Sequence, residues 1–461
     1  MDRDKYRIEK DSMGEVQVPV EALYGAQTQR AVVNFTISPQ TLPWSFIAAV
    51  LVIKAAAART NGELGLLTPE SADLICESID ELLKVQPMAQ FPISIFQTGS
   101  GTSTNMNVNE VIVGMVRKKG VELSPNDHVN LCQSSNDVIP TALQISAVQA
   151  ATESLLPALR ELAVIIRKCG ADNSDVIKTG RTHLMDALPI RLQAELEAWA
   201  VQLDECAERI ESALPRLGRL PLGGTAVGSG VNCHPDFSAQ AIVHINRKTT
   251  LVFTQAISCY KGLSCLDTVV EFSGHLKTCA ISLSKIANDL RWMNSGPLTG
   301  LGEIKLPALQ PGSSIMPAKV NPVIPEAVCM AAAQVIGNDT TINLAGMGGS
   351  FQLNTMLPLA AANILQSIDL LTGSARALGE KAIRNMTVNR RNFERALSLN
   401  PILVTSLNPV VGYLKAAEIA KIAQKENRPV LDVALEQTDI PREELQRLLD
   451  PKNLADGGHG K

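Results

Sequence analysis

Residues 192–214 read LQAELEAWAVQLDECAERIESAL, and this stretch decides the fold class. Its apolar side chains recur at steps of three and four residues, and they are Leu192, Leu196, Trp199, Leu203, Cys206, Ile210 and Leu214. Because an α-helix has 3.6 residues per turn, this spacing places them on one helix face. The stretch therefore predicts a long helix that buries one side.

Four further windows share this long apolar periodicity. They span residues 141–169, 235–263, 266–290 and 322–345. Together with 192–214 they predict five helices, each about 40 Å long at 1.5 Å per residue. Several windows are apolar on more than one face, which indicates burial all round and an oligomer that shares helices. We therefore predict a mainly α fold with a central long five-helix bundle.

The chain changes character twice along its length. Residues 1–138 are mixed, with strand-like pieces near the N-terminus and an apolar helical window at 46–58. The long helices follow, and after residue 360 prolines cut the sequence into short helices. We predict three domains, namely an N-terminal mixed, mostly helical domain (1–138), a central long-helix bundle (139–360) and a C-terminal small helical domain (361–461).

Composition and charge exclude several classes of function. The 461 residues carry 42 basic and 46 acidic side chains, a net charge of −4, which argues against nucleic acid and anionic membrane surfaces as partners. The 9 cysteines form no C-x-x-C pair, so we expect reduced thiols, no zinc site and no cofactor. A charged N-terminus without an apolar core and the absence of a long apolar run predict a cytoplasmic protein without a membrane span.

Four polar segments interrupt the apolar pattern at predicted helix boundaries, where unpaired backbone N–H groups are available. They span 98–102 (TGSGT), 133–137 (QSSND), 180–186 (GRTHLMD) and 310–322. Small residues let backbone amides approach a ligand, and a Ser/Asn/Asp-rich helix start attracts anions. Taken singly, none of these segments decides the function, because a solvated loop or a simple helix cap is the commoner explanation for each.

Two side chains in these segments could transfer protons. His183 changes charge near neutral pH, although a lone histidine is more often structural. Ser313 could act as a base only if several N–H donors and a nearby ammonium such as that of Lys319 stabilised its alkoxide. Together with the amide of Asn321, the set suits a small dicarboxylate and proton abstraction beside a carboxylate.

The segment 312–322, GSSIMPAKVNP, resembles the G-S-S-x-M-P-x-K-x-N-P signature of the fumarase/aspartase superfamily. Residues 24–29 (YGAQTQ) and 98–110 resemble its fumarase and aspartase branch. QSSND at 133–137 is similar to class II fumarases, whereas aspartases more often read Q-S-T-N-D. Two further segments, LGGTAVGSG at 222–230 and IANDLRW at 286–292, also resemble class II fumarases, and the likeness runs from about residue 5 to 455.

This resemblance implies a three-domain L-aspartase-like fold, a homotetramer with a 20-helix core, and active sites built from three subunits. It implies iron-independent hydration of fumarate to (S)-malate, a step of the tricarboxylic acid cycle. Ser313 then matches the base that takes the C3 proton of malate. His183 matches the histidine that serves the C2 hydroxyl through a water, and Glu326 matches the carboxylate that pairs with that histidine. The implied dicarboxylate-binding residues are Ser100, Gly101, Thr102, Ser134, Ser135, Asn136, Thr182, Ser314, Lys319, Val320 and Asn321.

The sequence departs from the family pattern at three places. Ala318 stands where fumarases usually have glycine, and Gln193-Ala194 replaces a common Gly-Gln pair. The residues Ser124, Pro125, Asn126 and Asp127 align with an H-P-N-D segment that marks a secondary dicarboxylate site, called the B site. Ser124 lacks the imidazole, which puts the secondary site in doubt.

Two other functions remain open from the sequence. Aspartate ammonia-lyase shares the fumarate product and most of the implied site, and the hydroxyl at Ser135 favours a fumarase. A non-catalytic crystallin-like scaffold would be expected to lose catalytic positions. Ser313, His183, Glu326 and Lys319 are all present.

Overall fold

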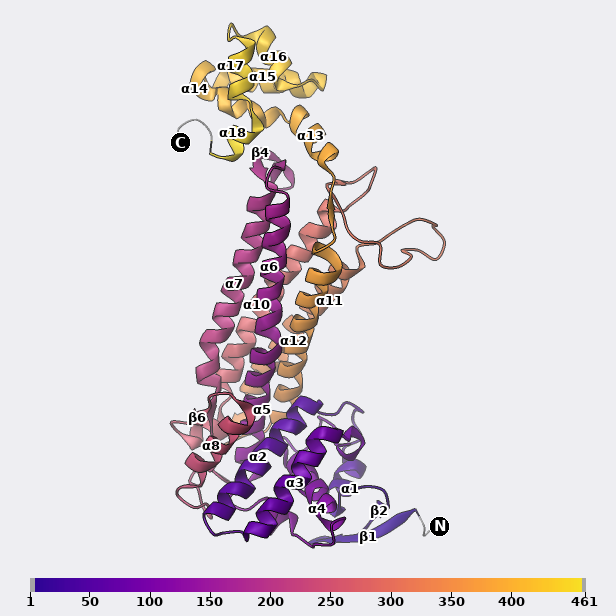
Figure 1. Cartoon of the computed structure of the whole chain (residues 1–461), viewed down its shortest axis with the longest axis vertical. Helices are drawn as coiled ribbons and strands as arrows, with labels where there is room; N and C mark the ends of the chain where they lie inside the picture. The colour runs from indigo at the N-terminus through magenta and orange to yellow at the C-terminus, as the bar shows by residue number, and fades with distance from the viewer. Residues whose placement is uncertain (1–4, 458–461) are drawn as a thin grey trace. The chain divides into compact units, whose positions relative to one another are not determined.

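The computed structural model describes residues 5–457, and most of them are helical (Figure 1). The chain forms two compact units, each assembled from three stretches. Unit 1 comprises residues 1–157, 207–280 and 333–372, and unit 2 comprises residues 158–206, 281–332 and 373–461. The predominance of helices confirms the predicted mainly α class.

Unit 1 begins with an antiparallel hairpin of β1 (Tyr6–Asp11) and β2 (Gly14–Pro19), at the two predicted strand-like pieces. The helix α2 (Trp44–Glu63) is buried on almost every face because α3, α5 and α8 pack against it. The other helices of this unit are α1 (Ala26–Asn34), α3 (Pro69–Val85), α4 (Thr102–Arg117), α5 (Ser135–Ala150), α8 (Phe237–Thr249) and α9 (Cys259–Ser264). Short elements are η1 (Met88–Gln90), η2 (Pro125–Val129), η3 (Ala151–Leu155), β5 (Arg219–Leu220), β6 (Thr254–Gln255), β8 (Gly349–Ser350) and β9 (Leu353–Asn354).

Helix starts in unit 1 follow their capping residues. The side chain of Thr68 accepts the N–H of Ser71 and is followed by a proline, so it starts α3. Ser134 and Asp137 form a reciprocal capping box at the start of α5. Gly101 precedes α4 with φ of +73°, a left-handed conformation that favours glycine.

The long helices confirm the predicted bundle. They are α6 (Leu156–Asp172), α7 (Leu192–Leu217), α10 (Asp267–Met293), α11 (Val323–Gly346) and α12 (Leu357–Ala377). On α7 every residue of the predicted stripe except Leu214 is buried. Side-chain hydrogen bonds join each of these helices to the next one along the chain. From α6 to α12 they are Arg167–Glu197, Arg216–Glu271, Lys277–Asp339 and Asn338–Gln366.

The prediction of one long helix was wrong. Residues 235–263 form α8 and α9, with β6 between them, rather than a single helix. The helix α8 ends at Thr249, and its cap Thr250 adopts a left-handed φ of +57°. The side chain of Asn246 then bonds the backbone of Phe253. The fifth long helix is α12 instead, continued by η4 (Leu378–Ile383).

Unit 2 contains a second hairpin and the short C-terminal helices. The hairpin pairs β3 (Ile177–Thr182) with β4 (Met185–Arg191), and β7 (Ile304–Lys305) pairs with β10 (Thr387–Val388). The remaining elements are α13 (Arg390–Leu399), η5 (Pro401–Leu407), α14 (Asn408–Val411), α15 (Tyr413–Glu426), α16 (Val430–Gln437), α17 (Arg442–Leu448) and α18 (Pro451–Ala455). Buried apolar side chains between Leu403 and Leu449 form a hydrophobic cluster of their own.

Within residues 5–457, no helix is both long enough and apolar enough to cross a membrane.

Candidate active site

The predicted site residues fall into two groups. Unit 1 carries the segments 98–102 and 133–137, and unit 2 carries the hairpin turn near His183 and the segment 310–326.

In unit 1 the segment 133–137 is held rigidly at the start of α5. The Asp137 carboxylate accepts the N–H groups of Ser134, Gly223 and Thr225, each at 2.9 Å. Burial raises the pKa of the Asp137 carboxyl to about 6, and these three backbone donors act in the opposite direction. The Ser134 hydroxyl oxygen accepts the N–H of Asn136, so the QSSND turn is fixed by backbone donors on both sides.

The segment 98–102 lies against this turn. The hydroxyl oxygens of Ser100 and Thr102 are 2.9 Å apart, and a Cβ on Gly101 would come within 2.8 Å of Ile139 on α5. One turn into α4, Asn105 Nδ2 donates to Ser135 Oγ at 3.1 Å. The first turns of α4 and α5 are therefore in contact, and two positive helix ends with several hydroxyls attract an anion.

The sequence analysis missed the groups beneath this turn. Lys54 on α2 and Asn130 are hydrogen-bonded to each other, and Asn105 bonds both Asn130 and Ser135. A usable signal was the single charged side chain in the apolar window 46–58.

In unit 2 the structure corrects the setting of His183. His183 and Leu184 form the two-residue turn between β3 and β4, with φ of +58° and +61°, instead of preceding a helix. Positive φ at both positions is typical of the hairpin turn that matches strand twist. The exposed imidazole stands at a strand turn, beside a cavity lined in part by Lys178 and Arg181.

Buried ion pairs anchor the base of this hairpin. Lys178 Nζ lies 2.8 Å from Glu195 and 3.2 Å from Glu303, and Arg181 lies 2.6 Å from Glu303. Lys178 and Glu303 are almost fully buried, so these charges depend on one another. The hairpin is thereby tied to the segment that leads to the signature loop.

The signature loop, residues 310–322, precedes α11 and is largely exposed. Ser313 Oγ accepts the N–H groups of Ile315 at 3.2 Å and Met316 at 3.0 Å. Asn321 Nδ2 donates to Gly312 O, and Gly312 N donates to Lys319 O. Two N–H donors aimed at the serine oxygen are the arrangement that stabilises an alkoxide.

Two loop positions show why their residue type matters. A Cβ on Gly312 would lie 2.4 Å from Lys319 O, so this site admits only glycine. Ala318 has φ of +69°, a left-handed conformation that costs energy for a residue with a Cβ. The positive φ explains in physical terms why glycine suits that place.

Several predicted partners do not meet in this chain. Among residues 5–457, no hydrogen bond or ion pair joins His183 to Glu326, nor the Lys319 ammonium to Ser313. Thr182, Ser314 and Val320 are exposed, and Glu326 is half-buried in the first turn of α11. The predicted roles of these residues stay predictions.

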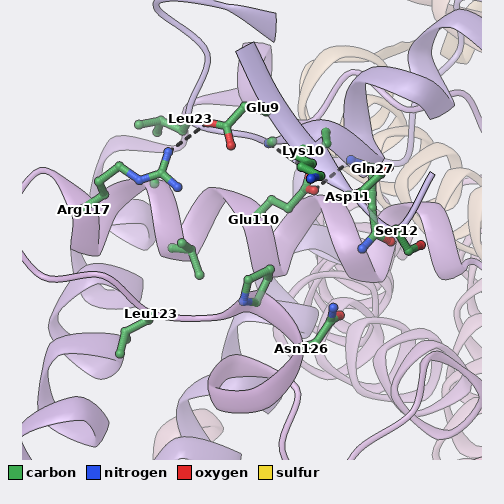
Figure 2. Close-up of a pocket in the computed structure, with 15 residues that line it drawn as sticks. Glu9, Lys10, Asp11, Ser12, Leu23, Gln27, Glu110, Arg117, Leu123 and Asn126 are labelled. Atoms are coloured by element: carbon green, nitrogen blue, oxygen red, sulfur yellow. Dashed lines mark hydrogen bonds and ion pairs between the residues drawn. The ribbon is translucent and has the colours of Figure 1, made fainter. Parts of the chain in front are cut away.

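The predicted secondary site uses its hydroxyl internally. Ser124 Oγ donates to Asp127 at 2.7 Å and accepts the Asp127 N–H, which starts η2. Pro125 and Asn126 line a pocket that also contains three carboxylates (Figure 2).

The charges of this pocket oppose a dicarboxylate. Its lining has the carboxylates of Glu9, Asp11 and Glu110 and the cations Lys10 and Arg117. Arg117 already pairs with Glu9 at 2.9 Å. Because its carboxylates outnumber its cations and like charges repel, the pocket does not favour a dianion. Binding at the secondary site stays a prediction, and this geometry does not support it.

In the described part of the chain, no cluster of three His, Cys, Asp or Glu side chains could hold a metal ion. The cysteines are free thiols.

Comparison with known proteins fits these features. Residues 14–337 match the lyase family, and residues 403–456 match the fumarase C C-terminus family. The chain is 54% identical over 453 residues to "Fumarate hydratase class II 2" of Pseudomonas aeruginosa, covering 98% of this chain and 99% of that protein. It is 53% identical to "Fumarate hydratase class II" of Xylella fastidiosa over 457 residues, covering 99% and 96%.

The fold agrees as well. The crystal structure of class II fumarase from Schistosoma mansoni superposes with a TM-score of 0.94 at 36% identity, covering 98% of this chain and 99% of that chain. This confirms the predicted fumarase/aspartase fold. On sequence and fold together, the chain belongs to the class II fumarate hydratase family.

Proposed function

We propose that this chain catalyses the reversible hydration of fumarate to (S)-malate. The observation that carries the proposal is the signature loop, in which two backbone N–H groups point at Ser313 Oγ. The loop belongs to a chain about half identical, over almost its full length, to proteins named for this reaction.

Read from malate to fumarate, the reaction breaks two bonds. Ser313 takes the C3 proton, and the C–H electrons move onto the adjacent carboxylate, which Lys319 and Asn321 stabilise. The electrons then return from the carboxylate to form the C2=C3 double bond as the C2–O bond breaks. The hydroxyl receives a proton by way of His183, which Glu326 orients, and leaves as water. Each donor aimed at the developing charge contributes about 3 kcal/mol.

Substrate binding is assigned to both segments of unit 1 and to neighbours of the base in unit 2. The hydroxyls and amides of Ser100, Ser134 and Asn136 suit one carboxylate, because helix N-termini and neutral donors bind anions without a full opposing charge. The rest of the proposed binding set is Gly101, Thr102, Ser135, Thr182, Ser314, Lys319, Val320 and Asn321.

We also propose a homotetramer in which the long helices form a 20-helix core and active sites are shared. Large apolar side chains on these helices are exposed in the single chain, and such patches mark contacts with other copies. They include Val164, Val201, Ile281, Met330, Ile336 and Leu344. Three domains, 1–138, 139–360 and 361–461, and a place in the cytoplasmic tricarboxylic acid cycle complete the proposal.

Aspartate ammonia-lyase is the nearest alternative, and one assay separates the two. The conjugated double bond of fumarate absorbs in the ultraviolet, so its formation is followed with malate and then with aspartate as substrate. We expect rapid fumarate formation from malate and none from aspartate. The reverse result would overturn the proposal, and no turnover of either would favour a non-catalytic scaffold.

A further inference from the structure

Lys54 is a charged side chain with no exposed surface. It lies on α2 among alanines, valines and isoleucines, and its exposed fraction is 0%. Burial lowers the pKa of its ammonium to about 7, and the negative charge of Asp137 acts in the opposite direction. Burying an ammonium costs several kcal/mol unless it is well hydrogen-bonded. A cost of this size calls for a compensating role.

The ammonium bonds neutral amides rather than a carboxylate. Nζ donates to Asn130 Oδ1 at 2.9 Å and to Gln133 Oε1 at 3.0 Å, both in the segment that leads into α5. Across the described residues, no ion pair forms at this nitrogen. The nearby Asp137 carboxylate is directed at three backbone N–H groups. The positive charge of Lys54 is therefore not cancelled by a direct contact.

Lys54 helps to fix the direction of a hydrogen-bond chain that ends at Ser135. Backbone carbonyls favour the same direction, because they accept from the Asn130 and Gln133 amide nitrogens. An ammonium only donates, so the Asn130 and Gln133 amides must turn their oxygens toward it. The same Asn130 oxygen also accepts Asn105 Nδ2 at 3.1 Å and Asn109 Nδ2 at 3.2 Å. Asn105 Nδ2 donates in turn to Ser135 Oγ at 3.1 Å. Because Ser135 Oγ accepts here, its own O–H remains available to donate to a ligand.

We propose that Lys54 is the positioning residue of the anion site at the start of α5. It acts with neighbouring backbone carbonyls to orient the chain from Asn130 through Asn105, so that Ser135 donates. It alone places a positive charge behind the helix N-terminus. The inference rests on the proposed function only for the identity of the anion as a dicarboxylate. The charge adds to the field of the helix end, which already favours negative ligands.

If the Lys54 ammonium stabilises a bound dianion, the dianion must stabilise the ammonium to the same extent. Ligand binding therefore raises the pKa of Lys54. Asp137 on α5 is the charged group that faces Lys54, and no charge on α3, α4, η2 or α8 acts on it within the described chain. Above neutral pH, ligand binding should therefore draw a proton onto Lys54. A purely structural lysine would not produce this uptake.

The test is calorimetric titration of the full chain with succinate, a saturated dicarboxylate that cannot be dehydrated. Titrations at pH 8 in two buffers of different ionisation heat report the protons taken up. Lys54→Gln keeps a hydrogen-bond donor and removes the charge. Asn61→Leu is the matched control, because Asn61 is equally buried on α2 and bonds Leu131 O at 3.0 Å without a charge.

We expect Lys54→Gln to weaken succinate binding about tenfold, equal to about 1.4 kcal/mol, and to lose the proton uptake of the parent. The KM for fumarate should rise by a similar factor while kcat changes little. Asn61→Leu should keep both the affinity and the uptake. A folded Lys54→Gln protein with parental affinity and uptake would overturn the inference, as would a parent that takes up no proton.

Asn105→Ala provides a second route if Lys54→Gln does not fold. It removes the donor to Ser135 and leaves the ammonium in place, so succinate binding should weaken while proton uptake persists. Unchanged affinity would contradict the hydrogen-bond chain. Failure of the proposed function looks different, because the parent would then bind succinate but not dehydrate malate. If malate turns over normally and Lys54→Gln matches the parent, only the Lys54 inference fails.

Discussion

Two polar segments that both precede a helix are built in opposite ways. The segment 133–137, before α5, is braced from below by Lys54 and from the side by the three N–H donors to Asp137. The signature loop, before α11, is exposed and mostly bonded to itself. A braced segment presents donors in fixed positions, whereas a self-contained exposed loop can move relative to its surroundings. The difference supports the proposal that the first segment binds the substrate in a fixed position and that the second supplies the base together with further binding groups.

The largest expected effect is on turnover. Ser313→Ala removes the proposed base, and we expect kcat to fall about 10³-fold, since general-base catalysis contributes about 10² to 10⁴. Succinate affinity should stay within twofold, because the braced segment is untouched. Steady-state kinetics and calorimetry check both values. Ser314→Ala is the neighbouring control and should act mainly on KM. A larger loss of kcat in Ser314→Ala than in Ser313→Ala would reassign the base.

A substitution that removes an anchor of the segment 133–137 should lower the unfolding free energy more than one within the signature loop. Asp137→Ala leaves three backbone N–H groups without an acceptor, two half-buried and that of Thr225 buried, which costs about 3 kcal/mol. The unfolding free energy from urea titration measures this change. Asn321→Ala, which removes one bond within the exposed loop, should cost about 1 kcal/mol at most. Equal costs for the two variants would remove the contrast between the segments.

The smallest expected effect concerns backbone strain. Ala318→Gly places glycine at a φ of +69° and should stabilise the chain by about 0.5 kcal/mol. Gly101→Ala makes the opposite change at a φ of +73°, where its Cβ would meet Ile139, and should destabilise the chain by about 2 kcal/mol. Thermal unfolding curves measure both, and a destabilising Ala318→Gly would contradict the strain argument.

Much of this architecture could be predicted from apolar periodicity. The stripe through Leu196, Trp199 and Leu203 is buried along α7, because a repeat of three and four has one helical solution. The break after α8 could not be predicted this way. It depends on a left-handed Thr250 and on the bonds between Asn246 and Phe253, which leave no trace in hydrophobic spacing.

The site was predictable as a set of segments but not as a network. Ser134, Ser135 and Ser313 stood out by composition, whereas the turn at His183 lacks the Asn-Gly or Asp-Gly pair that signals a two-residue hairpin. Lys54 contacts residues 76 and 79 positions later in the chain, so only the folded structure brings them together. The proposed pairing of His183 with Glu326 does not form within the described chain and remains tied to the proposed assembly.

The most direct test of this division of roles is deuterium exchange at C3 of malate. (S)-Malate is incubated in D2O with the parent protein or with Ser313→Ala, and proton NMR follows the C3 signal. We predict that the parent incorporates deuterium at C3 as malate and fumarate interconvert. Ser313→Ala should bind succinate normally yet incorporate almost no deuterium. Deuterium incorporation by Ser313→Ala at the parental rate would contradict the role of Ser313 as the base.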